Sequence, residues 1–336
     1  MCGIVGYVGG RDAVPVILDG LQRLEYRGYD SAGLAVVNAG TLERRRSAGK
    51  LSNLAGSLSR EPLHGEWGVG HTRWATHGRP TEENAHPHLD CTGRLVVVHN
   101  GIVENHLEIR ARLSACGHRF VTQTDTEVLA HLVESAYRGS LEEAARAALA
   151  EVRGVYALVL LHRDEPQRLV AARMGPPLVV GIGEGERYLA SDVPALLPLT
   201  REFVFLEDGD IATVTPDSLR VTTSDGSLAP RAAQRVVWDP VQAEKGGFRH
   251  FMLKEIYEQP RAMRDTLLGR IGLEDGEVHL EELGPDAEGR RSAARVLLLA
   301  CGTSWHAALV GKFLIEHLAG IPTEVDYGSE FRYRSP

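Results

Sequence analysis

The second residue of the chain, Cys2, carries the side chain best suited to covalent chemistry. Because cysteine is small, we expect Met1 to be removed, which leaves a thiol and a free α-amine on one residue. An α-amine has an ordinary pKa of about 7.7–8.0, so part of it is neutral near pH 7 and can accept the thiol proton. Cys2 is therefore a candidate nucleophile that carries its own base. The alternative is a small apolar residue of the core, which is the usual role of an unpaired cysteine.

The other three cysteines are Cys91, Cys116 and Cys301, and their spacing matches neither a zinc site nor a disulfide framework. We expect reduced thiols in a cytoplasmic protein. Cys116 follows Ile109 and Leu113 at helical spacing and is predicted to be buried. The 14 histidines also lack a spacing typical of a metal site. The sequence therefore predicts neither a metal nor a cofactor.

The composition narrows the class of protein. Hydrophobic residues make up 43% and charged residues 24% of the 336, which suits a globular protein of two domains. A net charge of −8 argues against nucleic-acid binding. No apolar run approaches the ~18 residues of a membrane span, and the first residues lack the basic and apolar parts of a signal peptide. We expect a protein that binds neither nucleic acid nor membrane.

Strands and helices must position Cys2 and its partners. The predicted elements are a strand at 2–8, a helix at 12–25, strands at 34–37, 69–72 and 95–99, and helices at 124–136 and 141–152. Residues 124–127 have the spacing of a capping box. Short strands then follow over residues 155–214, and Asp208-Gly209 predicts a hairpin between the last two. Strands, a helix pair and more strands indicate stacked sheets with helices on their outer faces.

From residue 296 onward the sequence has a different pattern. Residues 296–300 form a continuous apolar strand suited to a buried parallel sheet, and a helical stretch to about Leu318 and a strand near Val325 follow. This is one βαβ unit. Because two strands do not make an independently stable sheet, we expect the chain to be a fragment of a longer protein.

Several long motifs resemble the class II glutamine amidotransferases, which are N-terminal-nucleophile hydrolases. They are Met-Cys-Gly-Ile-Val-Gly at the start, Arg-Leu-Glu-Tyr-Arg-Gly-Tyr-Asp-Ser-Ala-Gly at 23–33, His-Thr-Arg-Trp-Ala-Thr-His-Gly at 71–78, and His-Asn-Gly-Ile-Val-Glu-Asn at 99–105. The resemblance implies an α+β fold of four layers, αββα. It also implies that Cys2 takes ammonia from L-glutamine through a thioester.

The rest of the chain resembles one branch of that family, which aminates a sugar phosphate. The matching segments are residues 249–260, 301–304 and 329–334. The resemblance implies a glutaminase domain at 2–238, a linker with helices at 239–290, and the truncated start of an α/β sugar-isomerase (SIS) domain at 291–336. It further implies fructose 6-phosphate as acceptor and a homodimer when the protein is full length. Because the family's isomerisation residues lie beyond Pro336, we expect this chain to hydrolyse glutamine without making the amino sugar.

The resemblance and the residue types together suggest roles in the glutamine site. The planar fork of Arg73 suits the substrate carboxylate, and Asp125 suits its α-ammonium, although Asp125 could instead cap the helix that follows. Asn100 and the backbone N–H of Gly101 would form the oxyanion hole. The alternative is that Asn100-Gly101 is a hairpin turn, but the residues from Ile102 onward read as helical, which weakens it.

Four further residues match family positions. Trp74, Thr76 and His77 lie in the segment that closes over glutamine in the family, although Trp74 could equally be a core aromatic. His77, like most histidines here, could be purely structural. Arg27 matches a position near the N-terminal amine.

Thr303 and Ser304 lie between a strand and a helix, where hydroxyls and backbone N–H groups suit a sugar phosphate. The alternative is an ordinary capped helix start. Three other functions remain open: another class II amidotransferase such as the purine-pathway enzyme, a non-catalytic sugar-phosphate-binding regulator, and an autoprocessing hydrolase of the same broad fold.

Overall fold

The structure is a computed structural model that describes residues 2–75, 78–237, 248, 250–267, 278 and 293–334. The chain divides into two compact units, Met1–Lys254 and Glu255–Pro336, and each is described by itself. The domain boundaries predicted at 238 and 290 fall outside the described residues. In the described part of the chain, no helix is long and apolar enough to cross a membrane.

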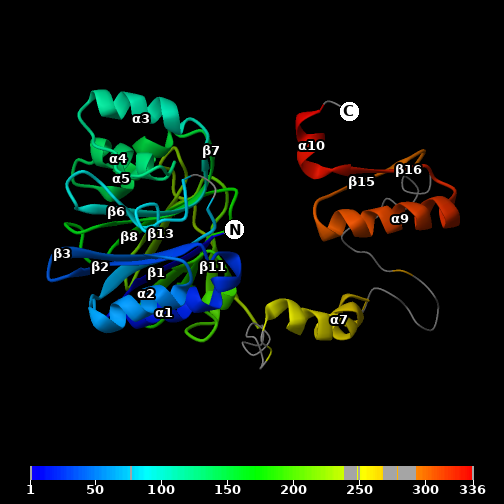
Figure 1. Cartoon of the computed structure of the whole chain (residues 1–336), viewed down its shortest axis with the longest axis horizontal. Helices are drawn as coiled ribbons and strands as arrows, with labels where there is room; N and C mark the ends of the chain where they lie inside the picture. Colours follow the sequence, from blue (N-terminus) through cyan, green and yellow to red (C-terminus); the bar gives the residue numbers. More distant parts are fainter. Residues whose placement is uncertain are drawn as a thin grey trace. The chain divides into compact units, whose positions relative to one another are not determined.

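Two sheets form the centre of the first unit (Figure 1), and every described strand pair within them is antiparallel. The larger sheet has the order β14 (Gln234–Arg235), β11 (Glu202–Phe205), β9 (Val179–Ile182), β10 (Arg187–Ala190), β1 (Gly3–Val8), β4 (Trp67–Arg73), β2 (Ser31–Asn38), β3 (Thr41–Ala48). The smaller sheet has the order β13 (Leu219–Thr222), β12 (Ile211–Val214), β8 (Leu169–Met174), β7 (Gly154–His162), β6 (Leu95–Val103), β5 (His88–Leu89).

Helices cover the outer face of each sheet (Figure 1). The larger sheet carries α1 (Ala13–Arg23) and α2 (Leu51–Arg60), and the smaller sheet carries α3 (His106–Ala115), α4 (Glu127–Ala136) and α5 (Leu141–Leu149). Two short 3-10 helices, η1 (Glu25–Arg27) and η2 (Val193–Ala195), complete the unit. The resulting order of layers is αββα, which confirms the predicted fold.

Three clusters of buried apolar side chains lie between the four layers. They arise because successive side chains along a strand point to opposite faces of the sheet. On β1, Val5 and Tyr7 pack with α1 and α2, whereas Ile4 and Val8 pack between the two sheets. On β6 and β7 one set of alternate residues faces the other sheet and the next set faces the helices. Because both faces of these strands are buried, their sequences read as continuous apolar runs.

The turn at Asp208-Gly209 does not close a hairpin, contrary to the sequence prediction. The strand before it, β11, pairs with β9 and β14 in the larger sheet, whereas the strand after it, β12, pairs with β8 and β13 in the smaller one. The turn itself forms as expected, with Gly209 at φ 88°. A turn signal sets local backbone geometry only, so the choice of partner strands falls to long-range packing.

Two other local predictions were wrong. The strand β6 continues through Asn100-Gly101 to Val103, because it pairs with β7 along its whole length, and helix α3 begins only at His106. Cys116 is exposed at the end of α3 rather than buried. The helix turns it to the solvent side, opposite Ile109 and Leu113, which are buried.

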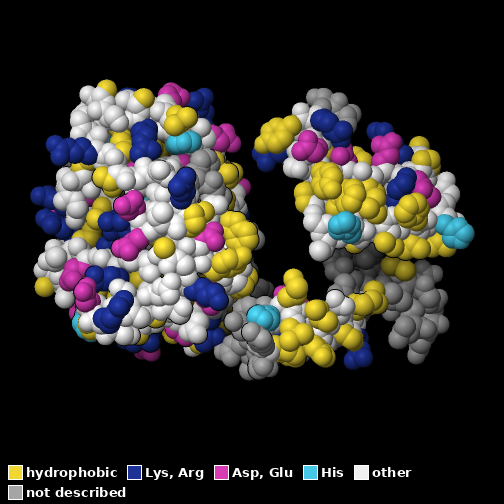
Figure 2. All heavy atoms as spheres, in the orientation of Figure 1, with side chains coloured by type: hydrophobic (Ala, Val, Ile, Leu, Met, Phe, Trp, Pro, Cys, Tyr) yellow, Lys and Arg dark blue, Asp and Glu magenta, His cyan; other side chains and the backbone are white. Residues whose placement is uncertain are grey.

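The second unit contains the predicted βαβ unit. Strands β15 (Val296–Ala300) and β16 (Thr323–Tyr327) pair in parallel, with α9 (Thr303–Ala319) between them and α10 (Gly328–Tyr333) after them. A further helix, α7 (Phe251–Leu267), precedes this part. Hydrophobic side chains gather over α9 (Figure 2), and they include the exposed Val310, Phe313 and Leu318. Such a face is typical of a surface that packs against further structure.

Candidate active site

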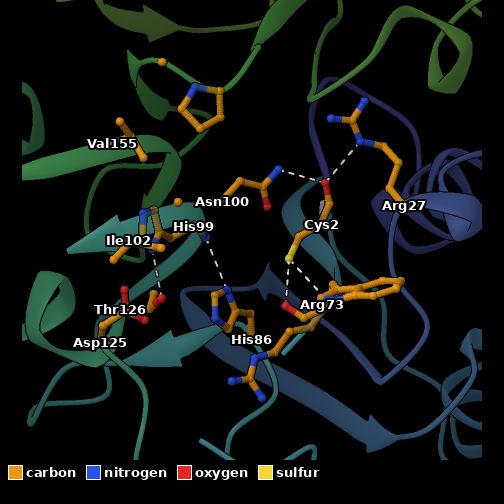
Figure 3. A pocket seen from close by; sticks show the side chains of 14 residues that line it. Cys2, Arg27, Arg73, His86, His99, Asn100, Ile102, Asp125, Thr126 and Val155 are labelled. Carbon is orange, nitrogen blue, oxygen red and sulfur yellow. Dashed lines mark hydrogen bonds between the residues drawn. The ribbon is translucent and has the colours of Figure 1, made fainter. Parts of the chain in front are cut away.

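Cys2 lies immediately before the central strand β1, at one end of a cavity of about 500 Å³ in the first unit (Figure 3). Strand β1 pairs with β10 on one side and with β4 on the other, so the start of the chain is held in place. The Trp74 N–H donates to Cys2 Sγ at 3.1 Å. The carbonyl oxygen of Cys2 accepts from Asn100 Nδ2 at 2.9 Å and from Arg27 Nε at 3.3 Å. Three groups therefore fix the position of this residue.

Burial raises the pKa of the Cys2 thiol, while the Trp74 N–H and the charges of Arg73 and Arg27 act in the opposite direction. The net direction is upward. A thiol with a raised pKa is mostly protonated near pH 7 and is a poor nucleophile without a base. A base close to Cys2 is therefore necessary for covalent chemistry here.

Arg27 connects Cys2 to Asp192, the residue that precedes η2. Its Nη1 pairs with Asp192 Oδ2 at 2.6 Å, and Tyr26 donates to the same oxygen at 2.7 Å. The next residue, Gly28, lies so close to the backbone of Arg73 that a Cβ there would come within 2.8 Å of the Arg73 carbonyl carbon. The glycine thus allows η1 to approach the end of β4 beside the nucleophile.

Asn100 is oriented by a buried histidine. His71 Nε2 lies 3.1 Å from the carbonyl oxygen of His99 and 3.0 Å from Asn100 Oδ1. A backbone carbonyl only accepts, so Nε2 carries the proton and the Asn100 side chain must present its oxygen to His71. Its Nδ2 then points to Cys2, as Figure 3 shows. Burial lowers the pKa of His71 to about 3, so the ring stays neutral.

Arg73 and Asp125 place opposite charges in the same cavity, and both are almost fully buried. Arg73 ends β4 and donates to the carbonyl oxygens of Gly78 and Arg79 at 3.2 and 3.3 Å. Burial lowers the pKa of Arg73, while Cys2, Asp125 and Asp30 favour its charge. The carboxylate of Asp125 accepts from the Val103 N–H at 2.9 Å, which ties it to the end of β6.

The other predicted site residues lie in different surroundings. Gly101 lies within β6 at φ 143°, where a Cβ would come within 2.0 Å of the Val155 carbonyl oxygen. Trp74 is 46% exposed at the cavity and meets Tyr29 edge to ring at 5.4 Å, so it is not a core aromatic. Thr76 and His77 lie outside the described residues.

Thr303 and Ser304 belong to the second unit, where they begin α9 and are exposed. They follow Gly302, which takes a positive φ of 60°. Gly302 is the N-cap of α9, so the helix start has no side-chain cap hydrogen bond from its N-cap residue.

The capping-box spacing at 124–127 is used differently from the prediction. Thr124 Oγ1 does accept from the Glu127 N–H at 3.3 Å. The Glu127 carboxylate, however, accepts from the N–H groups of Val121 and Thr122 instead of returning to Thr124. These hydrogen bonds hold in place the segment from which Asp125 reaches the cavity.

Sequence reasoning missed two residues that position the nucleophile and its partner, His71 and Asp192. His71 stands in the motif at 71–78, but nothing local shows that its ring meets Asn100, 29 positions away. Asp192 lies 165 positions from Arg27. The sequence did offer one signal for His71: it is a polar residue within a short strand that is otherwise expected to be buried, and such residues usually have a specific hydrogen-bond partner.

Three buried histidines, His71, His86 and His88, form a group at the cavity. The rings of His71 and His86 stack at 4.1 Å, and those of His86 and His88 meet edge to face at 4.6 Å. Burial lowers the pKa of each below the ordinary 6.5. An unfolded chain therefore takes up protons that the folded chain refuses. The stability that the neutral rings contribute is present above pH 6.5 and is lost as the pH falls towards their folded pKa values.

We predict that the free energy of unfolding falls by about 1 kcal/mol per buried histidine when the pH drops from about 6.5 to about 5.5. Urea titrations of the wild type, His88→Gln and His64→Gln at both pH values measure this. In His88→Gln the free energy of unfolding should fall by about 1 kcal/mol less than in the wild type, because one buried histidine is missing. His64 lies at the surface beside Asp12, so its variant should keep the full fall that the buried histidines cause. Equal pH dependence in all three proteins would contradict the prediction.

Known proteins resemble both parts of the chain. Residues 71–198 match the family described as "Glutamine amidotransferase domain", and residues 291–336 match "SIS domain". The chain is 54% identical over 336 residues to "Glutamine–fructose-6-phosphate aminotransferase [isomerizing]" of Symbiobacterium thermophilum and 56% identical over 337 residues to that of Thermus thermophilus. Each alignment covers 100% of this chain and 55% of the relative, so the chain spans about half their length.

A solved structure shows the same fold. The glutamine phosphoribosylpyrophosphate amidotransferase from B. subtilis matches with a TM-score of 0.60 at 20% identity, covering 96% of this chain and 65% of that one. At this identity the likeness concerns the fold alone. The conclusion from sequence, motif order and fold is that the chain belongs to the class II glutamine amidotransferases with an attached SIS segment, and is a homologue of the glutamine–fructose-6-phosphate aminotransferases.

Proposed function

We propose that this chain hydrolyses L-glutamine to glutamate and ammonia, with Cys2 as nucleophile. The observation that carries the proposal is the position of Cys2 Sγ at a cavity that also contains Arg73 and Asp125. A buried cation and a buried anion suit the carboxylate and ammonium of an amino acid. The raised thiol pKa supports the need for a base, and the α-amine exposed by loss of Met1 provides one.

In the proposed mechanism the α-amine of Cys2 accepts the thiol proton, and Sγ attacks the carboxamide carbon. The carbonyl π bond opens, and Asn100 Nδ2 and the Gly101 N–H stabilise the oxyanion. The C–N bond then breaks, and the amine returns its proton to the leaving nitrogen, which departs as ammonia. Water hydrolyses the γ-glutamyl thioester to glutamate and restores the thiol.

Substrate orientation follows from the two charges. Arg73 would hold the α-carboxylate and Asp125 the α-ammonium, so the side-chain amide extends towards Cys2. Trp74 at the cavity rim, together with Thr76 and His77, would close over the substrate and keep water from the thioester. Arg27 would hold the Cys2 backbone during the reaction.

For the longer protein we propose transfer of this ammonia to fructose 6-phosphate, giving glucosamine 6-phosphate. The printed names of the relatives and the SIS match support this acceptor. Thr303 and Ser304, at the start of α9, would contact the sugar phosphate. We assign 2–238 to the glutaminase domain, 239–290 to the linker and 291–336 to the start of the SIS domain. A cytoplasmic homodimer is the proposed form of the full-length protein.

Arg73 provides the test of this function. We predict that Arg73→Lys raises the KM for glutamine by about 10–100-fold with a smaller change in kcat, because a point charge replaces a bidentate, charge-assisted pair worth about 1.5–3 kcal/mol. Glutamate release from glutamine measures both constants. Arg94 is an exposed arginine paired with Asp164, so Arg94→Lys should have the KM and kcat of the wild type.

A second substrate distinguishes the loss of a contact with the substrate carboxylate from a disturbance of the fold. Glutaminamide, which lacks the α-carboxylate charge, should be a poor substrate for the wild type, and Arg73→Lys should lose little more with it. A loss of equal size with both substrates would show that Arg73 acts on the fold rather than on the carboxylate. No glutamate release by the wild type would refute the function itself.

A further inference from the structure

We propose that the first unit contains a zinc site formed by Cys91, His118, His131 and Glu134. These residues lie apart from the cavity of Cys2, and none of them lines it. Cys91 belongs to the turn between β5 and β6, His118 to the connection between α3 and α4, and the other two to α4 itself. One ligand atom of each lies within 4.8 Å of all the others.

The distances between these atoms fit one tetrahedral ion. Cys91 Sγ lies 3.4 Å from His131 Nδ1 and 3.8 Å from His118 Nδ1. Glu134 Oε2 lies 3.2 Å from His131 Nδ1 and 3.0 Å from His118 Nδ1. Ligands at zinc bond lengths of about 2.0–2.3 Å stand roughly 3.3–3.7 Å apart in a tetrahedron. Each of these four distances lies within a few tenths of an ångström of that range.

The local structure already holds the ligands in this arrangement. His131 and Glu134 are three residues apart on α4 and so share one face of the helix. The Arg119 N–H donates to Cys91 Sγ at 3.3 Å, and the Cys91 N–H donates to Glu134 Oε2 at 3.1 Å. These contacts bring the turn and the connection to the helix before any ion binds.

A carboxylate faces the far side of His131, beyond hydrogen-bond distance in this structure. Its ring is buried, and Nε2 lies 3.8 Å from Glu127 Oε1. A carboxylate behind a ligating imidazole fixes its tautomer and raises its basicity. Glu127 is itself fixed by the N–H groups of Val121 and Thr122.

The ligand set favours zinc over other divalent ions. One thiolate, two imidazoles and one carboxylate match the borderline-soft character of Zn²⁺ and its tetrahedral preference, whereas Mg²⁺ and Ca²⁺ select oxygen ligands. Four protein ligands leave no open position, which is typical of a structural site. Cys91 is exposed, so an ion can enter from solvent. The ion would join three segments, including the one that leads to Asp125.

Sequence spacing concealed this site. The ligands are separated by 27, 13 and 3 positions along the chain. The intervals contain a strand and a whole helix, so no local ligand motif arises. The absence of a metal site, expected from spacing alone, is therefore revised by this proposal.

Cobalt titration of the whole chain, stripped with a chelator and kept reduced, tests the site. We expect one Co²⁺ per chain, with the thiolate charge-transfer band and the intense visible bands of tetrahedral cobalt, and displacement by one Zn²⁺. Cys91→Ser should abolish the thiolate band. His118→Gln should weaken zinc binding by at least about 100-fold, since even outer partners of ligands contribute 10–100-fold. Cys116→Ser, which removes an exposed thiol outside the cluster, should bind as wild type.

The N-terminal Cys2 is the main competitor, because its thiol and amine can chelate a metal together. In a Cys2→Ala background the cobalt spectrum should persist. A thiolate band that survives Cys91→Ser in that background, or wild-type zinc affinity in His118→Gln, would overturn the proposal, as would the lack of tetrahedral cobalt in the wild type. Circular dichroism of the metal-free variants verifies folding. Excess zinc should raise the Tm of the wild type and of Cys116→Ser but not of Cys91→Ser.

Discussion

Replacement of Cys2 by alanine or serine should reduce glutamate release by on the order of 10⁴-fold or more, because the covalent route then disappears. A form that keeps Met1, or whose Cys2 amine is acetylated, should lose most of the rate although its thiol is intact. The reason is that burial raises the thiol pKa and the blocked amine no longer accepts the proton. Steady-state rates of the native, Met1-retaining and Cys2→Ala proteins, with mass spectrometry of each N-terminus, measure these effects.

The pH dependence distinguishes the amine from any other base. In the native form, kcat/KM should rise with pH through the pKa of the α-amine, and this limb should vanish in the blocked form. Cys301→Ala is the matched control, since it removes an exposed thiol of the second unit and should leave the rate unchanged. Equal rates in the native, blocked and Cys2→Ala proteins would refute the assigned nucleophile.

Replacement of Asn100 by alanine should lower kcat by about 10²–10³-fold, which corresponds to about 2.7–4 kcal/mol for one oxyanion donor. The KM for glutamine should change much less, because the oxyanion exists only in the transition state. Asn53→Ala is the control, since Asn53 lies on α2 and its exposed side chain donates to the carbonyl oxygen of Ala48 at the end of β3. Initial rates over a range of glutamine concentrations separate kcat from KM.

Asn100 also donates to the Cys2 carbonyl oxygen, so a structural role has to be separated from the catalytic one. Alkylation of Cys2 by iodoacetamide requires a correctly placed thiol but forms no oxyanion. We expect Asn100→Ala to be alkylated within a few-fold of the wild-type rate. A fall in alkylation as large as the fall in hydrolysis would show that Asn100 only positions Cys2.

Much of the architecture could be predicted because local patterns determine it. The continuous apolar strands, the helix pair after them and the βαβ unit near the end of the chain all appear as expected. Helix and strand periods and turn residues are properties of a few neighbouring positions. The strand β3 was missed, because its sequence, Thr-Leu-Glu-Arg-Arg-Arg-Ser-Ala, is that of an exposed edge with little apolar alternation.

The same limit explains the wrong local predictions. Gly209 does form a turn, yet the strands on either side join different sheets. Residues after Gly101 carry helical periodicity, yet pairing with β7 keeps them extended to Val103. Cys116 has helical spacing to buried residues, yet the end of α3 turns it to solvent. In the first two cases a long-range contact outweighed a weak local preference, whereas Cys116 is exposed because of its own position at the end of α3.

The sequence by itself determined the chemistry of the candidate site: a cysteine beside the initiating methionine, an arginine and an aspartate for an amino acid's charges, and an asparagine followed by glycine. Residue type decides what a group can donate, accept or attack. Only the tertiary structure decided which groups meet. The pairing of β6 with β7 and the packing of η1 against β4 bring Asn100 and Arg27 to the Cys2 carbonyl. Folding likewise gathers Cys91, His118, His131 and Glu134, because contacts between distant positions depend on the whole packed chain.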